Sequence, residues 1–125
     1  MNMIEEIKGT FRMEIRPNSQ GLEYLEAVIN KKDLALLQSL LKKHLGPAAK
    51  EPGKEPNLPK EIQKIIGAMG GLWRDQSFFY KQEGNEVIYA ALWPWESNPN
   101  KITLKSGLKK LVSKESYGNS DKWED

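Results

Sequence analysis

The sequence predicts an α+β domain with a largely antiparallel sheet of about four to five strands, two main helices and a short C-terminal helix. Three observations support this class: short runs of alternating apolar residues, a leucine-rich segment with helical spacing, and clusters of turn formers between them. Runs of strands with helices set between them are typical of antiparallel α+β folds. The expected order is ββααβββα. The 125 residues suit a single domain, which we expect to span 1–114, with a disordered polar tail at 115–125.

The first two strands are expected at 10–16 and 22–29. In the first, Phe11, Met13 and Ile15 alternate with polar residues, as in a strand with one buried face. Residues 17–21 are turn formers. The second segment ends in two β-branched residues, although its leucine and valine spacing also fits a helix.

Two helices should follow. Six leucines within 34–45 span about half of a helical wheel, so this helix should lie on a sheet, with Asn30 or Asp33 as its N-cap and Gly46 as its end. Residues 46–59 hold four of the seven prolines and predict a semi-extended surface loop. The second helix should begin near Pro59, bury a narrow stripe and end at 70–71; the stripe is Ile62, Ile65, Ile66 and Met69.

A hairpin is expected around the loop at 83–86. A turn centred on Gly84 and Asn85 places Tyr80 opposite Tyr89, Phe78 opposite Ala91 and Gln76 opposite Trp93, and a slip of one residue would change each pair. Pro94 should mark the end of the second strand. A further strand is expected at 101–105, and Ser106 could cap the short last helix.

Aromatic residues are dense in and around this hairpin. The candidate binding surface consists of Trp73, Arg74, Tyr80, Tyr89, Trp93 and Trp95. Aromatic side chains at such positions more often belong to the core, and the alternative is an exposed platform for a ring-shaped ligand, a base or a partner's side chain. The two tryptophans around the stiff Pro94 could close the edge of the core or anchor a partner.

The net charge is only +2, but the charged residues are distributed unevenly along the sequence. Five lysines and no acidic residue occur within 97–114, while 72–96 carries four acidic and two basic residues. Such a lysine run is usually a solvated surface. A weak anion site is also conceivable at a helix start, formed by Lys101, Lys105, Ser106, Gly107 and Lys109, although no glycine-rich loop precedes it.

The composition excludes several kinds of chemistry. With no cysteine and a single histidine, the chain cannot form a disulfide framework, a thiolate nucleophile, an iron–sulfur cluster or a multi-histidine metal site. We therefore expect no cofactor and no metal. His44 falls in the last turn of the leucine-rich helix, where bonding to local backbone is expected, and no sequence neighbour supplies an acid for catalysis.

The leading hypothesis from the sequence is a non-catalytic protein-interaction module, whose partner is another protein or a second copy. The alternative is nucleic-acid or anionic-ligand binding through the lysines of 101–114, and the second alternative is a small enzyme that uses His44 and an unidentified acid. No apolar run reaches the roughly 20 residues of a membrane helix, and the acidic start is unlike a signal peptide. A cytoplasmic location without a membrane partner is the expectation.

Overall fold

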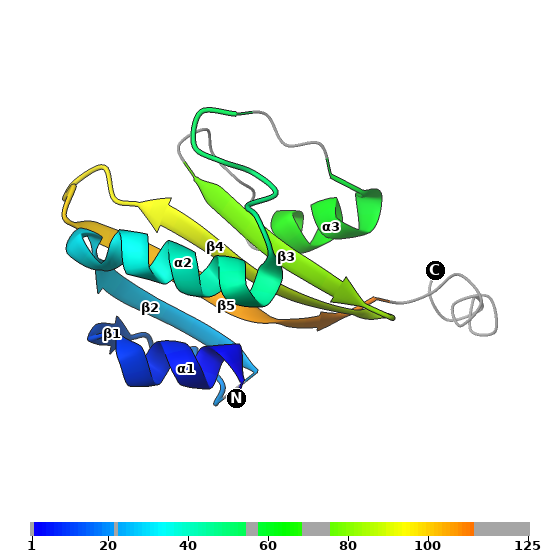
Figure 1. Cartoon of the computed structure of the whole chain (residues 1–125), viewed down its shortest axis with the longest axis horizontal. Helices are drawn as coiled ribbons and strands as arrows, with labels where there is room; N and C mark the ends of the chain where they lie inside the picture. The colour runs from blue at the N-terminus through cyan, green and yellow to red at the C-terminus, as the bar shows by residue number, and fades with distance from the viewer. Residues whose placement is uncertain (1, 22, 55–57, 69–75, 112–125) are drawn as a thin grey trace.

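The computed structural model describes residues 2–21, 23–54, 58–68 and 76–111. Within these ranges, one antiparallel five-stranded sheet has the order β1-β2-β5-β4-β3 and is accompanied by three α-helices (Figure 1). The α+β class and the antiparallel sheet are therefore confirmed. The elements are α1 (Met3–Thr10), β1 (Met13–Ile15), β2 (Tyr24–Asn30), the 3-10 turn η1 (Lys31–Asp33), α2 (Leu34–Leu45), α3 (Lys60–Ala68), β3 (Ser77–Glu83), β4 (Glu86–Pro94) and β5 (Lys101–Lys110).

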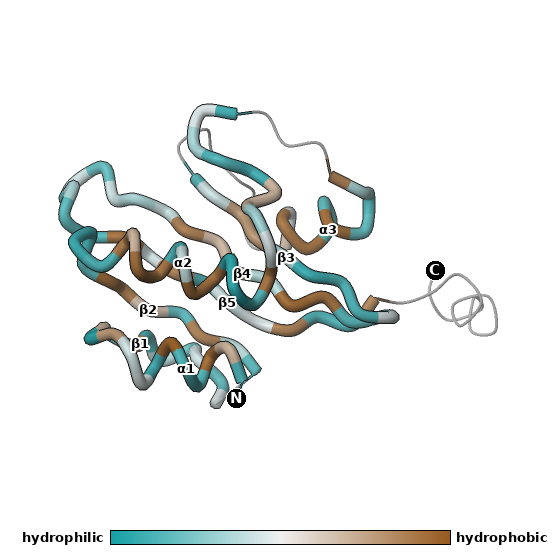
Figure 2. The backbone as a smooth tube through the Cα atoms, viewed as in Figure 1, coloured by the Kyte–Doolittle hydropathy of each residue, from teal (hydrophilic) through white to brown (hydrophobic). Residues whose placement is uncertain are grey.

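The sheet separates two hydrophobic cores. Helices α1 and α2 cover one face, where residues such as Ile7 and Leu41 pack against side chains from β2, β3, β4 and β5. Helix α3 lies on the other face, where Ile62 and Ile66 pack against β3 and β4. Apolar positions concentrate in the helices and along the strands, while most of the loops are polar (Figure 2). The burial of apolar surface on both faces is the main stabilising contribution.

The N-terminal helix corrects the prediction for this end of the chain. Asn2 caps α1, because its side chain accepts hydrogen bonds from the backbone N–H groups of Ile4 and Glu5. The expected strand at 10–16 is wrong in extent, since Thr10 ends α1 and β1 holds only three residues. Ile15, which was predicted to lie on the buried side of this strand, is 48% exposed. The reason is that β1 is a short strand at the edge of the sheet, which α1 covers only in part.

Helix α2 has the predicted bounds. Leu37, Leu40, Leu41 and Leu45 are buried, whereas Leu36 is 58% exposed, so the buried face is narrower than the leucine pattern indicates. Asn30 acts as a cap for η1, where its side chain accepts a 2.9 Å hydrogen bond from the N–H of Lys32. Asp33 makes no side-chain cap bond. Gly46 ends the helix with a φ of 84°, a conformation that favours glycine.

The proline-containing segment after α2 is more than the expected surface loop. Lys50 forms an antiparallel bridge with Phe78: the Phe78 N–H donates to the Lys50 carbonyl at 3.0 Å, and the Lys50 N–H donates to the Phe78 carbonyl at 3.2 Å. The Lys50 side chain is buried, and its Nζ donates to the Gln76 carbonyl at 2.7 Å. This segment therefore closes part of the outer edge of β3.

The hairpin of β3 and β4 has the predicted register, with Tyr80 opposite Tyr89 and Phe78 opposite Ala91. The expected C-terminal helix at Ser106 is wrong. β5 continues to Lys110 because it lies between β2 and β4, and both neighbours hold its backbone in the sheet. The observed order is αββααβββ. Several predicted features lie outside the described residues, namely Met69, the expected helix end at 70–71, Trp73, Arg74 and the tail at 115–125.

Candidate functional site: the open part of the second sheet face

The second face of the sheet is only partly covered by helix. The core under α3 draws its buried residues from α3, β3 and β4, and no residue of β2 or β5 belongs to it. Within the described ranges, the β2–β5 half of this face therefore has no helix over it. Side chains from β4, β5 and the turn between them line this half; we call Trp93, Trp95, Lys101, Thr103 and Lys105 the tryptophan–lysine strip.

Lysine and tryptophan alternate in contact along this strip. The ammonium of Lys105 lies 4.5 Å from the ring centroid of Trp93, and that of Lys101 lies 5.2 Å from the ring centroid of Trp95. Both distances are in the range of cation–π attraction, worth about 0.5–1 kcal/mol each at exposed sites. The Trp95 indole Nε1 also donates a 2.7 Å hydrogen bond to the Thr103 hydroxyl. All five side chains are partly exposed, so the strip is accessible from solvent.

Acidic groups adjoin the strip on its β2 side. Glu26 lies directly opposite Lys105 in the β2–β5 pair. Its carboxylate Oε1 accepts 2.8 Å hydrogen bonds from the Asn18 amide and the Tyr24 hydroxyl. Burial acts to raise the pKa of Glu26, but these two hydrogen bonds, together with the positive charges of Lys105 and Arg16, outweigh it and lower that pKa. The open face thus carries charges of both signs.

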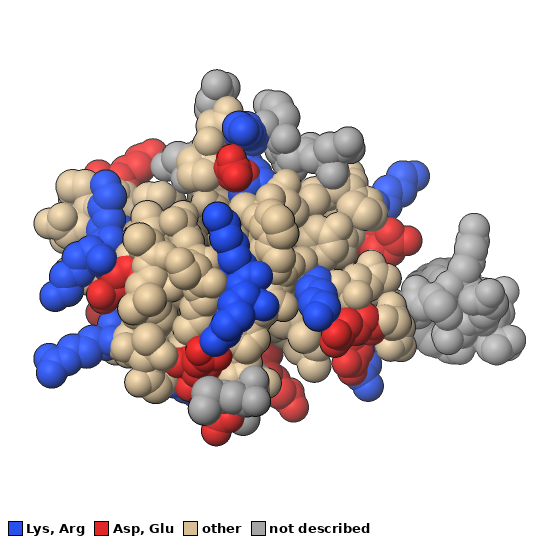
Figure 3. All heavy atoms as spheres, in the orientation of Figure 1, with Lys and Arg blue, Asp and Glu red and all other residues tan. Residues whose placement is uncertain are grey.

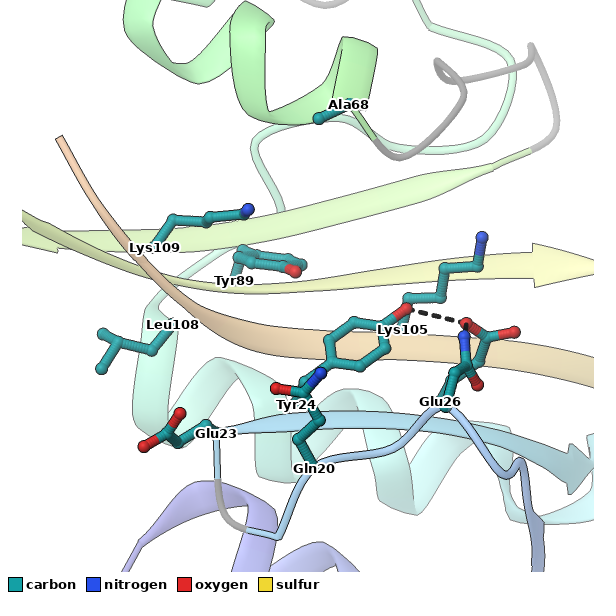
Figure 4. Close-up of a pocket in the computed structure, with 10 residues that line it drawn as sticks. Gln20, Glu23, Tyr24, Glu26, Ala68, Tyr89, Lys105, Leu108 and Lys109 are labelled. Carbon is teal, nitrogen blue, oxygen red and sulfur yellow. Dashed lines mark hydrogen bonds between the residues drawn. The ribbon is translucent and has the colours of Figure 1, made fainter. Parts of the chain in front are cut away.

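A cavity of about 450 Å³ opens beside the strip, which we call the tyrosine cavity (Figure 4). Tyr24 of β2 and Tyr89 of β4 present their rings to it across β5, and Lys105 and Lys109 rise from β5 on the same side (Figure 4). The other lining residues are Asn18, Gln20, Glu23, Glu26, Ala68 and Leu108. Burial raises the pKa of Tyr89; it also raises that of Tyr24, with help from the hydrogen bond to Glu26.

Gly107 makes this arrangement of tyrosines possible. It is the β5 residue that pairs with Tyr24 on one side and with Tyr89 on the other. A Cβ at this position would lie 2.9 Å from the Tyr89 hydroxyl, 3.1 Å from the Tyr24 ring and 3.1 Å from the Glu23 carbonyl. Only a residue without a side chain lets the two aromatic side chains approach so closely over the strand.

The structure divides the predicted aromatic surface. Tyr89 is 3% exposed and Phe78 is fully buried, and both pack in the core under α3. These two residues therefore belong to the core and not to an exposed platform. Tyr80 is half-buried against the same core. Trp93 and Trp95 remain half-exposed: Trp93 packs against the same core with part of its surface, and the Trp95 indole donates to Thr103 of β5. Of the described members of the predicted surface, these two tryptophans are the ones that contact lysines of β5.

The predicted anion site needs a correction. Lys101, Lys105 and Lys109 do lie on one side of β5, because they are separated by even numbers of residues in a strand. Ser106 is fully buried in the middle of that strand, and its hydroxyl donates to the Tyr89 carbonyl at 2.9 Å. No helix starts here, so Ser106 and Gly107 present no free row of backbone donors to an anion.

His44 has an acidic partner that its sequence neighbours do not supply. Its Nε2 lies 2.7 Å from Oε1 of Glu6 in α1, and the other Glu6 oxygen accepts a 2.6 Å bond from Lys43. The bonds from Lys43 and His44 lower the pKa of Glu6. A hollow of about 330 Å³ adjoins His44, and none of the residues described along its wall is serine or threonine. This pair joins α1 to α2 without supplying a nucleophile.

Among the described residues, no three His, Asp or Glu side chains are grouped so that they could hold a metal ion. In the same part of the chain, no helix has the length and apolar character needed to cross a membrane. On the side that carries α1 and α2, basic and acidic side chains are interspersed (Figure 3).

Sequence reasoning missed Tyr24, Glu26 and Glu6 as members of sites. Tyr24 and Glu26 alternate with Leu25 and Ala27, so strand periodicity assigns them to the face opposite the first core. Their meeting with Tyr89 and Lys105 depends on the strand order, which no local pattern contains. A comparison of the chain with protein-family models, curated proteins and solved structures found no match.

Proposed function

We propose that this protein is a non-catalytic protein-interaction module and that the tryptophan–lysine strip is the centre of its binding surface. The observation that carries the proposal is the pair of half-exposed tryptophans, each in contact with a lysine of β5, at the border of the core under α3. Tryptophan supplies large contact areas and is enriched among the residues that dominate binding energy. The lack of cysteine suits action in the reducing cytoplasm.

The contacts within the strip favour a protein partner over stacked bases. Each indole ring already has an ammonium over one face, and a base would have to displace it in order to stack there. A protein partner can match such a surface, because protein interfaces combine an aromatic centre with a rim of both charges.

The test compares strip variants with a matched control. We expect Trp93→Ala and Trp95→Ala to weaken self-association, measured as mass by light scattering over a range of concentrations, or binding to an identified partner. Leu36→Ala removes an exposed apolar side chain from α2, on the other side of the sheet, and should have no effect. If the alanine variants do not fold, Lys101→Glu can replace them, because it changes the strip with little loss of packing. Unchanged association of folded strip variants would contradict the proposal.

A second candidate is binding of single-stranded nucleic acid. The observation in its favour is that Lys101 and Lys105 do lie beside the tryptophans, which is the arrangement that such binding requires. Quenching of tryptophan fluorescence by an oligothymidylate, weakened by salt and by Lys101→Gln but not by Lys42→Gln on α2, would support it. Titrations that show no salt-sensitive quenching would remove this candidate.

A further inference from the structure

We propose that the tyrosine cavity is a binding site for a small organic anion, namely a carboxylate or phosphate group carried on a body the size of one ring. The inference does not depend on the proposed protein partner. The tyrosine cavity has a volume of about 450 Å³, which falls within the usual range for small-molecule sites. The site combines aromatic walls with a few polar groups from three adjacent strands, as such sites commonly do.

Three hydrogen-bond donors of the cavity are unused. The Tyr89 side chain is 97% buried by its surroundings, yet its hydroxyl has no hydrogen-bond partner in the described structure. Every fully enclosed side-chain oxygen or nitrogen of the described residues has a hydrogen-bond partner. Because the Tyr89 hydroxyl has none, it is not fully enclosed, and a ligand can reach it. The ammonium groups of Lys105 and Lys109 likewise form no hydrogen bond or ion pair. A hydroxyl and two ammonium groups together suit an oxyanion.

The strand geometry brings these donors to one place. Lys105 and Lys109 flank Gly107 on the same side of β5, and Tyr89 lies directly opposite Gly107 on β4. Because Gly107 has no side chain, the Tyr89 hydroxyl and the Tyr24 ring fill the space above it, between the two lysines. The rings of Tyr24 and Tyr89 offer apolar surface to the body of the ligand (Figure 4).

The acidic residues of the cavity do not change the preference for an anion. Glu26 already receives two hydrogen bonds at one oxygen, from Asn18 and Tyr24, so its charge is largely satisfied within the protein. Glu23 is exposed at the rim. A cationic ligand would therefore have to compete with Asn18 and Tyr24 for Glu26, whereas an anion meets donors that have no acceptor.

The direct test is a titration of the ¹⁵N-labelled protein with phenyl phosphate, benzoate, inorganic phosphate and benzylamine, followed by NMR chemical shifts. We expect phenyl phosphate or benzoate to saturate shifts at Gly107, Leu108 and Tyr89 with a Kd of about 1 mM or tighter. Phenyl phosphate and benzoate distinguish the two kinds of anion, and inorganic phosphate should bind more weakly because it lacks the ring. Equal or stronger binding of benzylamine, or no saturable shift with either aromatic anion, would overturn the proposal.

Substitutions locate the site. Tyr89→Phe keeps the ring and removes the hydroxyl, and Lys109→Gln removes one charge; each should weaken phenyl phosphate or benzoate binding by about three- to tenfold. Lys110→Gln is the matched control, because Lys110 is the next residue of β5, is exposed and does not line the cavity. If Lys110→Gln weakens binding as much as Lys109→Gln, the anion is attracted only by the general charge of β5 and the proposed site is wrong.

Discussion

The Nε2 atom of His44, in the last turn of α2, lies 2.7 Å from the Oε1 atom of Glu6 in α1. The two residues are 38 positions apart in the sequence, and the Glu6 carboxylate also accepts a bond from Lys43. One carboxylate thus joins the middle of α1 to the C-terminal turn of α2, where cationic side chains interact favourably with the helix dipole. The link between the two helices on the first sheet face is therefore electrostatic as well as hydrophobic.

Stability should depend on the ionisation of Glu6. Its pKa in the folded protein is lowered below the ordinary value of 4.5, chiefly by the bonds from Lys43 and His44. A lowered pKa stabilises the fold above the unfolded value and loses this contribution as the pH falls through the folded value. We expect Glu6→Gln to lower the melting temperature at pH 7, and this difference from the unmodified protein to shrink as the pH falls below 4.5. The control is Glu5→Gln, at a neighbouring acid without an ion pair; an equal loss in both variants would contradict the prediction.

Gly107→Ala should destabilise the protein by about 1–3 kcal/mol, because the new methyl group would press on the Tyr89 hydroxyl, the Tyr24 ring and the Glu23 carbonyl. The free energy of unfolding in urea is the measurement. Gly67→Ala in α3 is the matched control: no atom lies within 4 Å of the added carbon, and alanine favours a helix, so this variant should be neutral or more stable. Equal effects at both glycines would show that the strand position is not crowded.

Thr103→Val should cost about 1 kcal/mol of unfolding free energy, because it leaves the Trp95 Nε1 donor without its acceptor. Valine retains the branched shape that suits a strand, so the loss reports on the hydroxyl. Thr103→Ser, which keeps the hydroxyl, should retain the hydrogen bond. In a double-mutant cycle, the extra cost of Thr103→Val should largely disappear in a Trp95→Phe background, and full additivity would disprove the interaction.

Leu41→Ala should destabilise the protein by about 2–5 kcal/mol, because Leu41 is fully buried between α2 and the sheet. Leu36→Ala, five residues earlier in the same helix and largely exposed, should change the free energy of unfolding by less than about 0.5 kcal/mol. Chemical denaturation of both variants measures the difference. Similar losses at the two leucines would mean that the helix is rotated relative to the described packing.

Local patterns were sufficient for the elements with strong periodicity. The leucine repeat defined α2 to the residue, and the turn at Gly84 and Asn85 determined the register of the β3–β4 hairpin. Local patterns failed to predict the elements whose conformation is determined by contacts with distant parts of the chain. Ser106 and Gly107 look like the start of a helix, yet β2 and β4 hold the chain on both sides as a strand. Helix α1 was missed because its eight residues carry a stripe of only three buried side chains.

The candidate site was only partly predictable for the same reason. The alternation of residues predicted that Tyr80, Tyr89 and Trp93 share a face, and they do. Which part of that face α3 covers depends on how the helix packs, so burial of Tyr89 and exposure of Trp95 could not be separated in advance. The tyrosine cavity needs β5 to lie between β2 and β4, an arrangement of strands far apart in the sequence.

The bridge between Lys50 and Phe78 bears on how molecules of this protein can meet. Unpaired strand edges invite other chains to add to a sheet and to form fibres. Here the bridge occupies the start of one outer strand, charged and polar side chains follow at its exposed end, and the opposite outer strand is only three residues long. Growth of the sheet by strand addition is thereby discouraged at both ends. An interface of the kind proposed above would then use the faces of the sheet, where side chains rather than backbone groups determine which partner fits.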